Sequence, residues 1–282
     1  MRVTFYGVRG SIATPGPSTV RYGGNTVCVE VRTADGSVIV LDAGTGIRVL
    51  GDKLVRSPLP DPIHVFITHA HWDHIVGAPF FAPLWRKDAH IVFHSLSERA
   101  ETSVVRRVLF DGEHFPVRAH ELPARIERPP YAGDSLRIGS ARVSRIELNH
   151  PGGADGFRID DDDGSSLCYL TDNELSPPSG AASSPRDLAH FARDVGLLIH
   201  DAQYLQSDMP QKRGWGHSLV EEVLELGRSA GAREVVLHHH DPARDDRALD
   251  RIALMALDWC RDHARAMMPI VAREGLVLDV AH

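Results

Sequence analysis

Apolar runs in the first part of the chain are short, and polar or glycine-containing segments separate them. Runs of this length that are rich in valine and isoleucine predict β-strands. The expected strands are Val3–Tyr6, Thr26–Arg32, Ser37–Leu41 and Ile63–Thr68. Residues 46–56 and 97–109 instead place apolar side chains at the spacing of an amphipathic helix. A Gly/Pro-rich loop at 7–17 follows the first strand, and a loop of this length is either mobile or functional.

The strand pattern returns in the second half, where helices interleave with it. The expected strands are Ala141–Leu148, Gly156–Asp160, Ser166–Leu170, Gly196–His200 and Glu234–His238. One expected helix carries Leu219, Val223, Leu226 and Ala230 on one face, and another runs from about Ala243 to Ala266. The acidic run Asp160–Gly164 is best explained by a hairpin turn. The pattern predicts two packed sheets covered by helices, an α/β fold of αββα four-layer sandwich type, in a single domain over residues 1–282.

Composition narrows the classes to which the protein can belong. The formal net charge of −7 argues against a protein that coats nucleic acid, because phosphate binding depends on lysine and arginine. Cys28, Cys168 and Cys260 are far apart and odd in number, so no disulfide framework is expected. The N-terminus lacks an apolar signal core, and no stretch approaches the length of a membrane span. We therefore expect a soluble cytoplasmic protein.

The segment after the fourth expected strand is unusually rich in metal-ligand side chains. It reads Thr-His-Ala-His-Trp-Asp-His and carries the four candidates His69, His71, Asp73 and His74. Strand ends are where α/β proteins place their sites. Neutral imidazoles and carboxylates bind zinc and similar ions at about 2.0–2.2 Å. One compact ion cannot easily take all four ligands from so tight a stretch, so we expect two metals to share it.

Three further candidate ligands stand at the ends of other expected strands. They are His150, Asp172 and His239. Each could by itself be a capping or turn residue, but their shared placement favours a common edge of the sandwich. His240 is an alternative to His239, because three consecutive histidines blur the register of the strand end.

These residues together resemble the motif series of the metallo-β-lactamase superfamily. The resemblance begins at Leu41–Gly46, where Asp42 would orient the metal loop, and extends to about residue 242. It implies the αββα sandwich and two divalent metal ions. The implied ligands of the first ion are His69, His71 and His150, those of the second are Asp73, His74 and His239, and Asp172 would bridge both. Zinc is expected first, although manganese and iron also suit this set.

A second group of residues is similar to the branch that contains ribonuclease Z and related cyclic phosphodiesterases. His217 lies in a Gly-His-Ser segment before an expected helix, where the free N–H groups of a helix start could bind an anion. Asp201 ends an apolar strand and could orient His217. A plainer reading is that His217 or Ser218 only caps the helix.

The resemblance and the residues together favour a phosphodiesterase that acts on small or cyclic phosphodiesters. A metal-bridging hydroxide would attack phosphorus, Asp73 would position or deprotonate that water, and His217 would assist the leaving group. Ribonuclease Z carries a long tRNA-binding arm between its third and fourth metal motifs, whereas residues 151–171 leave no room for one, so a tRNA substrate is not expected. The alternatives are a hydrolase of carbon esters, lactones or thioesters and a non-catalytic metal-binding module. The sequence leaves open whether the chain forms a homodimer.

Overall fold

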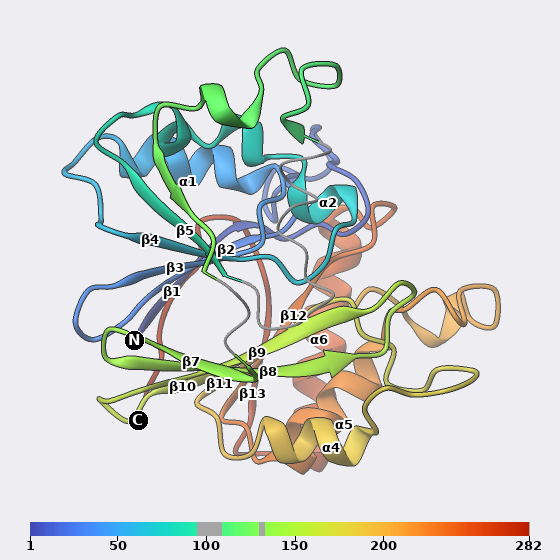
Figure 1. Cartoon of the computed structure of the whole chain (residues 1–282). Coiled ribbons are helices and arrows are strands. Elements are labelled where there is room, and N and C mark those ends of the chain that lie inside the picture. The colour runs from blue at the N-terminus through green and yellow to red at the C-terminus, as the bar shows by residue number, and fades with distance from the viewer. Residues whose placement is uncertain (95–108, 130–132, 282) are drawn as a thin grey trace.

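The computed structural model describes residues 1–94, 109–129 and 133–281. In these residues two seven-stranded mixed sheets lie face to face, and helices cover their outer faces (Figure 1). The first sheet has the strand order β14-β1-β2-β3-β4-β5-β6, and the second has the order β13-β12-β11-β10-β9-β8-β7. The predicted αββα sandwich is confirmed.

The element bounds are as follows. The first sheet contains β1 (Arg2–Gly7), β2 (Cys28–Arg32), β3 (Val38–Leu41), β4 (Ile63–Phe66), β5 (His90–His94), β6 (Arg125–Glu127) and β14 (Val277–Asp279). The second contains β7 (Ser135–Ile138), β8 (Ala141–Leu148), β9 (Ala154–Asp161), β10 (Ser166–Leu170), β11 (Leu197–Asp201), β12 (Glu234–His238) and β13 (Met268–Val271). The α-helices are α1 (Gly46–Leu54), α2 (Trp72–Ile75), α4 (Pro185–Phe191), α5 (Val220–Ala230) and α6 (Asp246–His263). Short 3-10 turns are η1 (Ala78–Phe80), η2 (Ala82–Trp85), η3 (Ala119–Glu121) and η4 (Gln206–Asp208).

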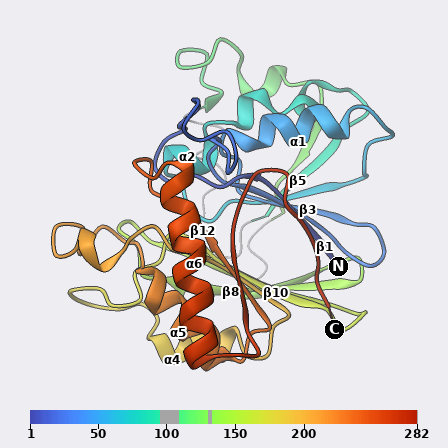
Figure 2. The same ribbon diagram turned by 180° about the vertical axis from the view of Figure 1, so that it is seen from behind.

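Three apolar layers hold the sandwich together. The middle layer lies between the sheets, where the rings of Phe66 and Phe157 meet edge to face at 5.3 Å. The second layer packs Leu50 of α1 and its neighbours on the first sheet. The third packs Val223 of α5 and Leu249 of α6 on the second sheet, and α6 runs along one edge of the molecule (Figure 2). No helix in the described part of the chain combines the length and apolar character that crossing a bilayer requires.

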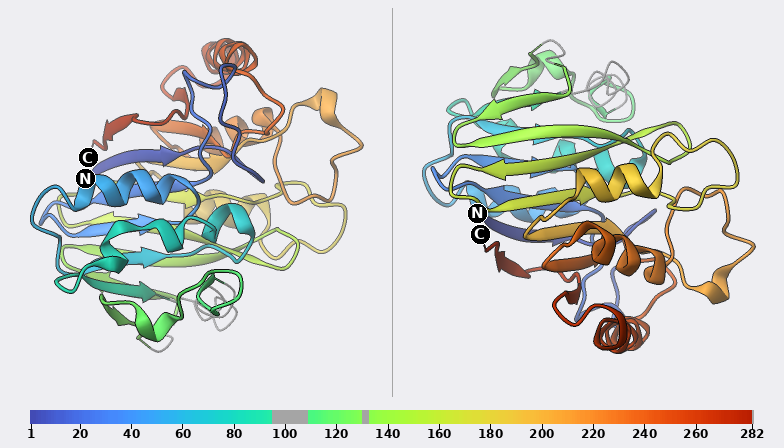
Figure 3. Two further views of the ribbon diagram at one scale, coloured as in Figure 1. Left: turned by 90° about the horizontal axis from the view of Figure 1, so that it is seen from above. Right: turned by 90° about the horizontal axis from the view of Figure 1, so that it is seen from below.

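The strand directions bring several strand ends to one edge of the sandwich. In the first sheet β3 and β4 are parallel, with Leu41 opposite Phe66. In the second sheet β10, β11 and β12 are parallel, with Asp201 opposite His238 at the last register pair. Views from above and below, which look onto the faces of the two sheets, show their strands roughly aligned (Figure 3). Residues that follow these strands therefore meet at the same edge, where α/β proteins bind ligands.

Most predicted elements are confirmed with small changes at their ends. The strands β8 and β12 have the predicted bounds, whereas β4 ends at Phe66 and β2 begins at Cys28. The acidic run does form the β9–β10 turn, closed by the hydrogen bond from the Gly164 N–H to the Asp161 carbonyl (2.9 Å). We did not predict β5, β6, β7, β13 and β14, and apart from β5 each is short and offers too few apolar positions for a clear pattern. The helix predicted over 97–109 lies, except for Leu109, outside the described residues.

Candidate metal centre

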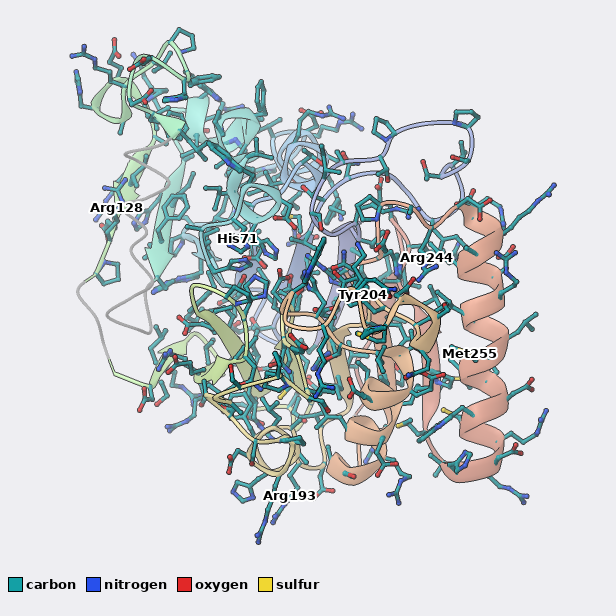
Figure 4. The ribbon with its side chains drawn as sticks, turned by 90° about the vertical axis from the view of Figure 1, so that its right-hand side faces the viewer. His71, Arg128, Arg193, Tyr204, Arg244 and Met255 are labelled. Carbon is teal, nitrogen blue, oxygen red and sulfur yellow. The ribbon has the colours of Figure 1, made fainter. Side chains whose placement is uncertain are left out.

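The candidate ligands come from both sheets and meet at the shared edge. The first sheet contributes the segment after β4, in which His71 precedes α2. The second contributes His150 after β8, Asp172 after β10 and His239 after β12. His71 is the exposed member of the group, and it lies where the segments over the first sheet approach the second (Figure 4).

The first ligand group is His69, His71, His150 and Asp172, whose ligand atoms lie within 4.8 Å of one another. His150 Nε2 is 3.1 Å from His71 Nδ1. Asp172 Oδ2 is 3.5 Å from His150 Nε2 and 3.6 Å from His69 Nε2. Three imidazoles and one carboxylate oxygen therefore converge on one point, which is the donor set that zinc prefers.

The second ligand group is Asp73, His74, Asp172 and His239. Here Asp172 Oδ1 lies 3.1 Å from His74 Nε2 and 3.0 Å from His239 Nε2. Asp73 Oδ2 lies 3.4 Å from His74 Nε2 and 3.2 Å from His239 Nε2. All four residues are buried.

Asp172 divides its two carboxylate oxygens between the groups. Oδ2 faces the first group and Oδ1 faces the second, which is the arrangement that the bridging role requires. Its backbone has φ +57°, and His239 has φ +58°. Non-glycine residues adopt this left-handed conformation at a cost of about 1–3 kcal/mol, and they do so most often at functional sites.

A second observation, independent of the distances between the ligand atoms, also fits a metal pair. Nε2 of His69 and Nε2 of His74 are buried and make no hydrogen bond. Buried polar atoms of this kind are rare, because leaving one unpaired costs about 1–3 kcal/mol. One cation in each ligand group would satisfy these nitrogens through their lone pairs.

Hydrogen bonds behind the ligands fix which ring nitrogen faces the centre. His74 Nδ1 donates to Asp42 Oδ2 (2.9 Å), and His150 Nδ1 donates to the Gly216 carbonyl (3.0 Å). His239 Nδ1 donates to Gln203 Oε1 (3.1 Å). In each case the Nε2 lone pair is left for a metal, as in other histidine metal sites.

Asp42 accepts several of the hydrogen bonds that lie behind the ligands. It also accepts hydrogen bonds from the Thr68 N–H (2.8 Å) and the Tyr169 hydroxyl (3.0 Å). Asp42 is fully buried and links the ends of β3 and β4 to β10. This position suits the orienting role that the sequence resemblance implies for it.

Burial favours neutral imidazoles in the first ligand group. In the second ligand group the carboxylates create a strongly negative field. Burial, followed by the neighbouring His74, lowers the pKa of His69 well below its ordinary value. Burial also lowers the pKa of His150. Burial alone would lower the pKa of His74, but the charges of Asp172 and Asp73 outweigh it and raise that pKa well above the ordinary value. The field that favours a proton on His74 also favours a divalent cation in its place.

His217 borders both ligand groups. Its ring lies 5.0 Å from that of His239 and 5.3 Å from that of His150. Its Nδ1 donates to Asp201 Oδ2 at 2.7 Å, and Asp201 is fully buried. Burial would lower the pKa of His217, but the Asp201 charge and hydrogen bond outweigh burial and raise the pKa to about 9.

The capping interpretation of His217 and Ser218 is wrong. The N-cap of α5 is Leu219, whose backbone N–H donates to the Glu222 side chain (3.2 Å), so neither His217 nor Ser218 caps the helix. The Ser218 hydroxyl instead donates to the Asn173 carbonyl (2.6 Å), which ties the segment to the end of β10. At the start of α5, the N–H groups of Leu219 and Val220 bind the Glu222 side chain and the Tyr204 carbonyl, so these two groups are not available to an anion.

The structure also separates the three consecutive histidines. His239 lies in the second ligand group, whereas His240 Nε2 donates to the Ala272 carbonyl at 2.8 Å. His238 Nε2 lies 3.1 Å from the Gly7 carbonyl. His239 is therefore the member that faces the centre, and the alternative with His240 is wrong.

Two contributors to the site were not predicted from the sequence. The Ser11 N–H donates to Asp73 Oδ2 (2.7 Å), which gives the early Gly/Pro-rich loop a place in the site. Gln203 binds His239, as described above. Gly10 beside Ser11 shows why the loop needs glycine, because a Cβ there would stand 2.4 Å from the His239 ring. Only the composition of the loop hinted at this role.

Comparison with known proteins identifies the family. A family model described as the Beta-lactamase superfamily domain matches residues 38–240. The match covers more than half of the chain, so the protein belongs to this superfamily.

Individual relatives agree with this membership. A ribonuclease Z of Haloarcula marismortui is 25% identical over 285 residues, covering 85% of this chain and 86% of that protein. The crystal structure of a diphosphatase from the PhnP family superposes with a TM-score of 0.70 at 17% identity, covering 99% of this chain and 98% of that one. Unliganded yeast PDE1 superposes with a TM-score of 0.69 at 17% identity, covering 98% of each chain. At this identity the two superpositions show the fold, and the homologues place the chain among metal-dependent hydrolases.

Proposed function

We propose that the protein is a dinuclear metal-dependent phosphodiesterase that acts on small or cyclic phosphodiesters. The observation that carries the proposal is the His217–Asp201 pair at the border of both ligand groups. A buried histidine that is oriented by a carboxylate beside a proposed metal pair is suited to contact phosphoryl oxygens and to protonate alkoxide leaving groups. Hydrolysis of a thioester makes less use of such a proton donor, because a thiolate leaves more readily than an alkoxide.

The proposed ligands follow the two groups. His69, His71 and His150 would hold one ion, Asp73, His74 and His239 would hold the other, and Asp172 would bridge them. Two divalent ions supply, when bound, Lewis acidity toward the phosphoryl oxygens and a water activated for attack. Nitrogen and carboxylate donors suit zinc, and they also suit manganese or iron.

We assign Asp73 the task of positioning the attacking water and accepting its proton. The Ser11 N–H holds Asp73 through Oδ2 (2.7 Å), and Oδ1 would receive the proton. The Ser11 contact orients the carboxylate without adding a negative charge.

We assign His217 the task of proton donor. Asp201 binds Nδ1 and so keeps Nε2 as the group that meets the substrate. The Asp201 carboxylate raises the pKa of His217, which suits His217 to donate a proton to a phosphoryl oxygen or to the leaving alkoxide.

Two features support a small substrate. The hollow over the ligand groups measures about 270 Å³, and Ser11, Trp72 and His217 line it together with the candidate ligands. The connection from His150 to Asp172 consists of β9, β10 and their turns, with no protruding arm in it. The relative named ribonuclease Z makes RNA processing the main rival within the same chemistry.

The test is a hydrolysis panel with metal-loaded protein. The panel contains bis(p-nitrophenyl) phosphate, a 2′,3′-cyclic nucleotide, a precursor tRNA, a lactone and a thioester. We expect turnover of the first two compounds, and a loss of at least about 100-fold in kcat for Asp73→Ala and His217→Ala. His263→Ala, which removes an exposed histidine on α6, is the matched control and should leave kcat unchanged.

Several results would contradict the proposal. If both site variants kept the wild-type rate on the 2′,3′-cyclic nucleotide, whose leaving alkoxide needs a proton, the roles of Asp73 and His217 would be wrong. Preferred cleavage of the precursor tRNA, or of the lactone or thioester, would transfer the protein to one of the rival activities. Bound metal without turnover of any panel member would favour the non-catalytic module.

A further inference from the structure

A second hollow of about 380 Å³ adjoins the one over the ligand groups. Its walls come from the segment after β10, from η4 and the chain that follows it, and from the start of α5. His217 lines both hollows. A group in the second hollow therefore lies beside the proposed proton donor.

The geometry of displacement at phosphorus indicates which part of a substrate this hollow would bind. In an in-line displacement at phosphorus the attacking and leaving oxygens stand on opposite sides. The residue that protonates the leaving oxygen must lie on the leaving side, so space beyond His217 is space for the leaving alcohol. A volume of about 380 Å³ is at the lower end of the ~300–1,000 Å³ typical of ligand pockets.

The charged side chains that line the hollow differ in whether they make hydrogen bonds within the protein. Glu174 accepts hydrogen bonds from the N–H groups of Gly214 (2.9 Å) and Gly216 (3.0 Å). Glu222 accepts one from the Leu219 N–H (3.2 Å) at the start of α5. Both carboxylates therefore serve the backbone that shapes the hollow.

Arg213 has no such structural task. It is exposed, and its backbone N–H donates to the Pro210 carbonyl (3.1 Å), but in the part of the chain that the structure describes its side chain makes no hydrogen bond or ion pair. Its neighbour Lys212 is engaged, since Lys212 Nζ stands 4.3 Å over the Trp215 ring. A free guanidinium at the wall of a ligand hollow is suited to a phosphate or another oxyanion, which it can bind through two parallel N–H groups.

We propose that this hollow is the subsite for the leaving half of the substrate, and that Arg213 binds a second phosphate on that half. The substrate class is then a phosphodiester of an organic alcohol of about nucleoside size that carries a further phosphate group. This inference rests on the proposed phosphodiesterase function, because the position of His217 defines the leaving side.

The test measures binding and needs no turnover. Calorimetric titration of metal-loaded protein compares adenosine 3′,5′-bisphosphate, adenosine 5′-monophosphate and inorganic phosphate. We expect the bisphosphate to bind at least about tenfold more tightly than the monophosphate. Arg213→Gln should reduce that ratio to below about threefold, whereas Arg186→Gln, at an exposed arginine on α4, should preserve it.

A second variant tests the hollow itself. Ser176→Trp places a bulky ring in the lining, and it should weaken both nucleotides by about tenfold or more relative to inorganic phosphate. Equal affinity for the two nucleotides in the wild type, or a ratio that survives Arg213→Gln, would overturn the role of Arg213. Unchanged nucleotide binding in Ser176→Trp would overturn the subsite. Inactivity toward bis(p-nitrophenyl) phosphate is a separate result that contradicts only the proposed function.

Discussion

Gln203 contacts both parts of the proposed site, the candidate metal ligands and the His217–Asp201 pair. Its Oε1 accepts from His239 Nδ1 (3.1 Å), and its Nε2 donates to the Ser11 hydroxyl (3.3 Å). Its own N–H donates to Asp201 Oδ1 (3.0 Å). One buried residue thus holds a candidate metal ligand, the early Gly/Pro-rich loop and the hydrogen-bond partner of His217.

We expect Gln203→Met to weaken binding of one of two metal ions by about 10- to 100-fold, because His239 loses the acceptor that fixes its tautomer. Gln203→Glu keeps an acceptor at that position and should retain most of the affinity. Competition with a chromophoric chelator measures both constants. Equal affinities in wild type and Gln203→Met would show that Gln203 does not position His239.

At the scale of elements, β4 and β5 carry a pair of histidines that are not among the candidate metal ligands, one of them half-buried (His64) and one buried (His94). His64 Nδ1 and His94 Nε2 are 2.7 Å apart, and the His94 ring stacks on Phe66 at 4.7 Å. Burial lowers the pKa of each histidine to about 4. Charging either ring would therefore disturb the pairing of two central strands.

This pair predicts acid sensitivity of the fold. As pH falls, the unfolded chain takes up protons first, near the ordinary pKa of about 6.5. The contribution of the pair is fully present above that pH and is lost as the pH falls from about 6.5 to about 4. His94→Phe should reduce the loss of stability between about pH 7 and pH 5 in urea unfolding. The same pH dependence in wild type and variant would exclude the pair as its cause.

The element scale also shows what the apolar pattern could and could not predict. Alternating apolar residues identified β8, and short apolar runs identified β10 and β12, all with their bounds. The strand β5 has an apolar run of the same length as that of β12, Ile91, Val92 and Phe93 between two histidines, and the same criterion would have found it. The strands β6, β7, β13 and β14 lie at sheet edges, where each pairs with only one neighbouring strand. Such strands need fewer apolar or β-branched residues.

At the scale of the whole molecule, the candidate ligands join the two sheets. The segment that carries His69 belongs to the first sheet, and Asp172 and His239 belong to the second. A metal pair held by all of them is bound only by the folded chain, so it stabilises the sandwich as any native-state ligand does.

Chelation should therefore lower the thermal midpoint. With free metal at about 1,000 times its dissociation constant, binding contributes about 4 kcal/mol, which corresponds to roughly 10 °C for a chain of this size. Calorimetry with and without chelator measures the shift, and added metal should reverse it. In Asp172→Ala the shift should nearly vanish, whereas His263→Ala should keep it. A midpoint that is insensitive to chelator would contradict the metal pair.

The sequence by itself determined the chemistry available at the edge of the sandwich. Histidines and aspartates that follow apolar runs, at His69, His150 and Asp172, could be recognised because strand ends are readable from local apolar patterns. The family resemblance and the αββα layering rested on the same local signals. The coordinates place these residues together, as expected.

Only the tertiary structure decided which neighbours complete the site. The choice of His239 over His240 depends on a left-handed backbone at one position and on contacts with Gln203 and Ser11, which lie far away in the chain. The hollow beyond His217 and the free Arg213 likewise exist only once β10, η4 and α5 have come together. Side-chain direction at a strand end is set by packing between distant segments, and a local pattern of polar and apolar residues carries no record of that packing.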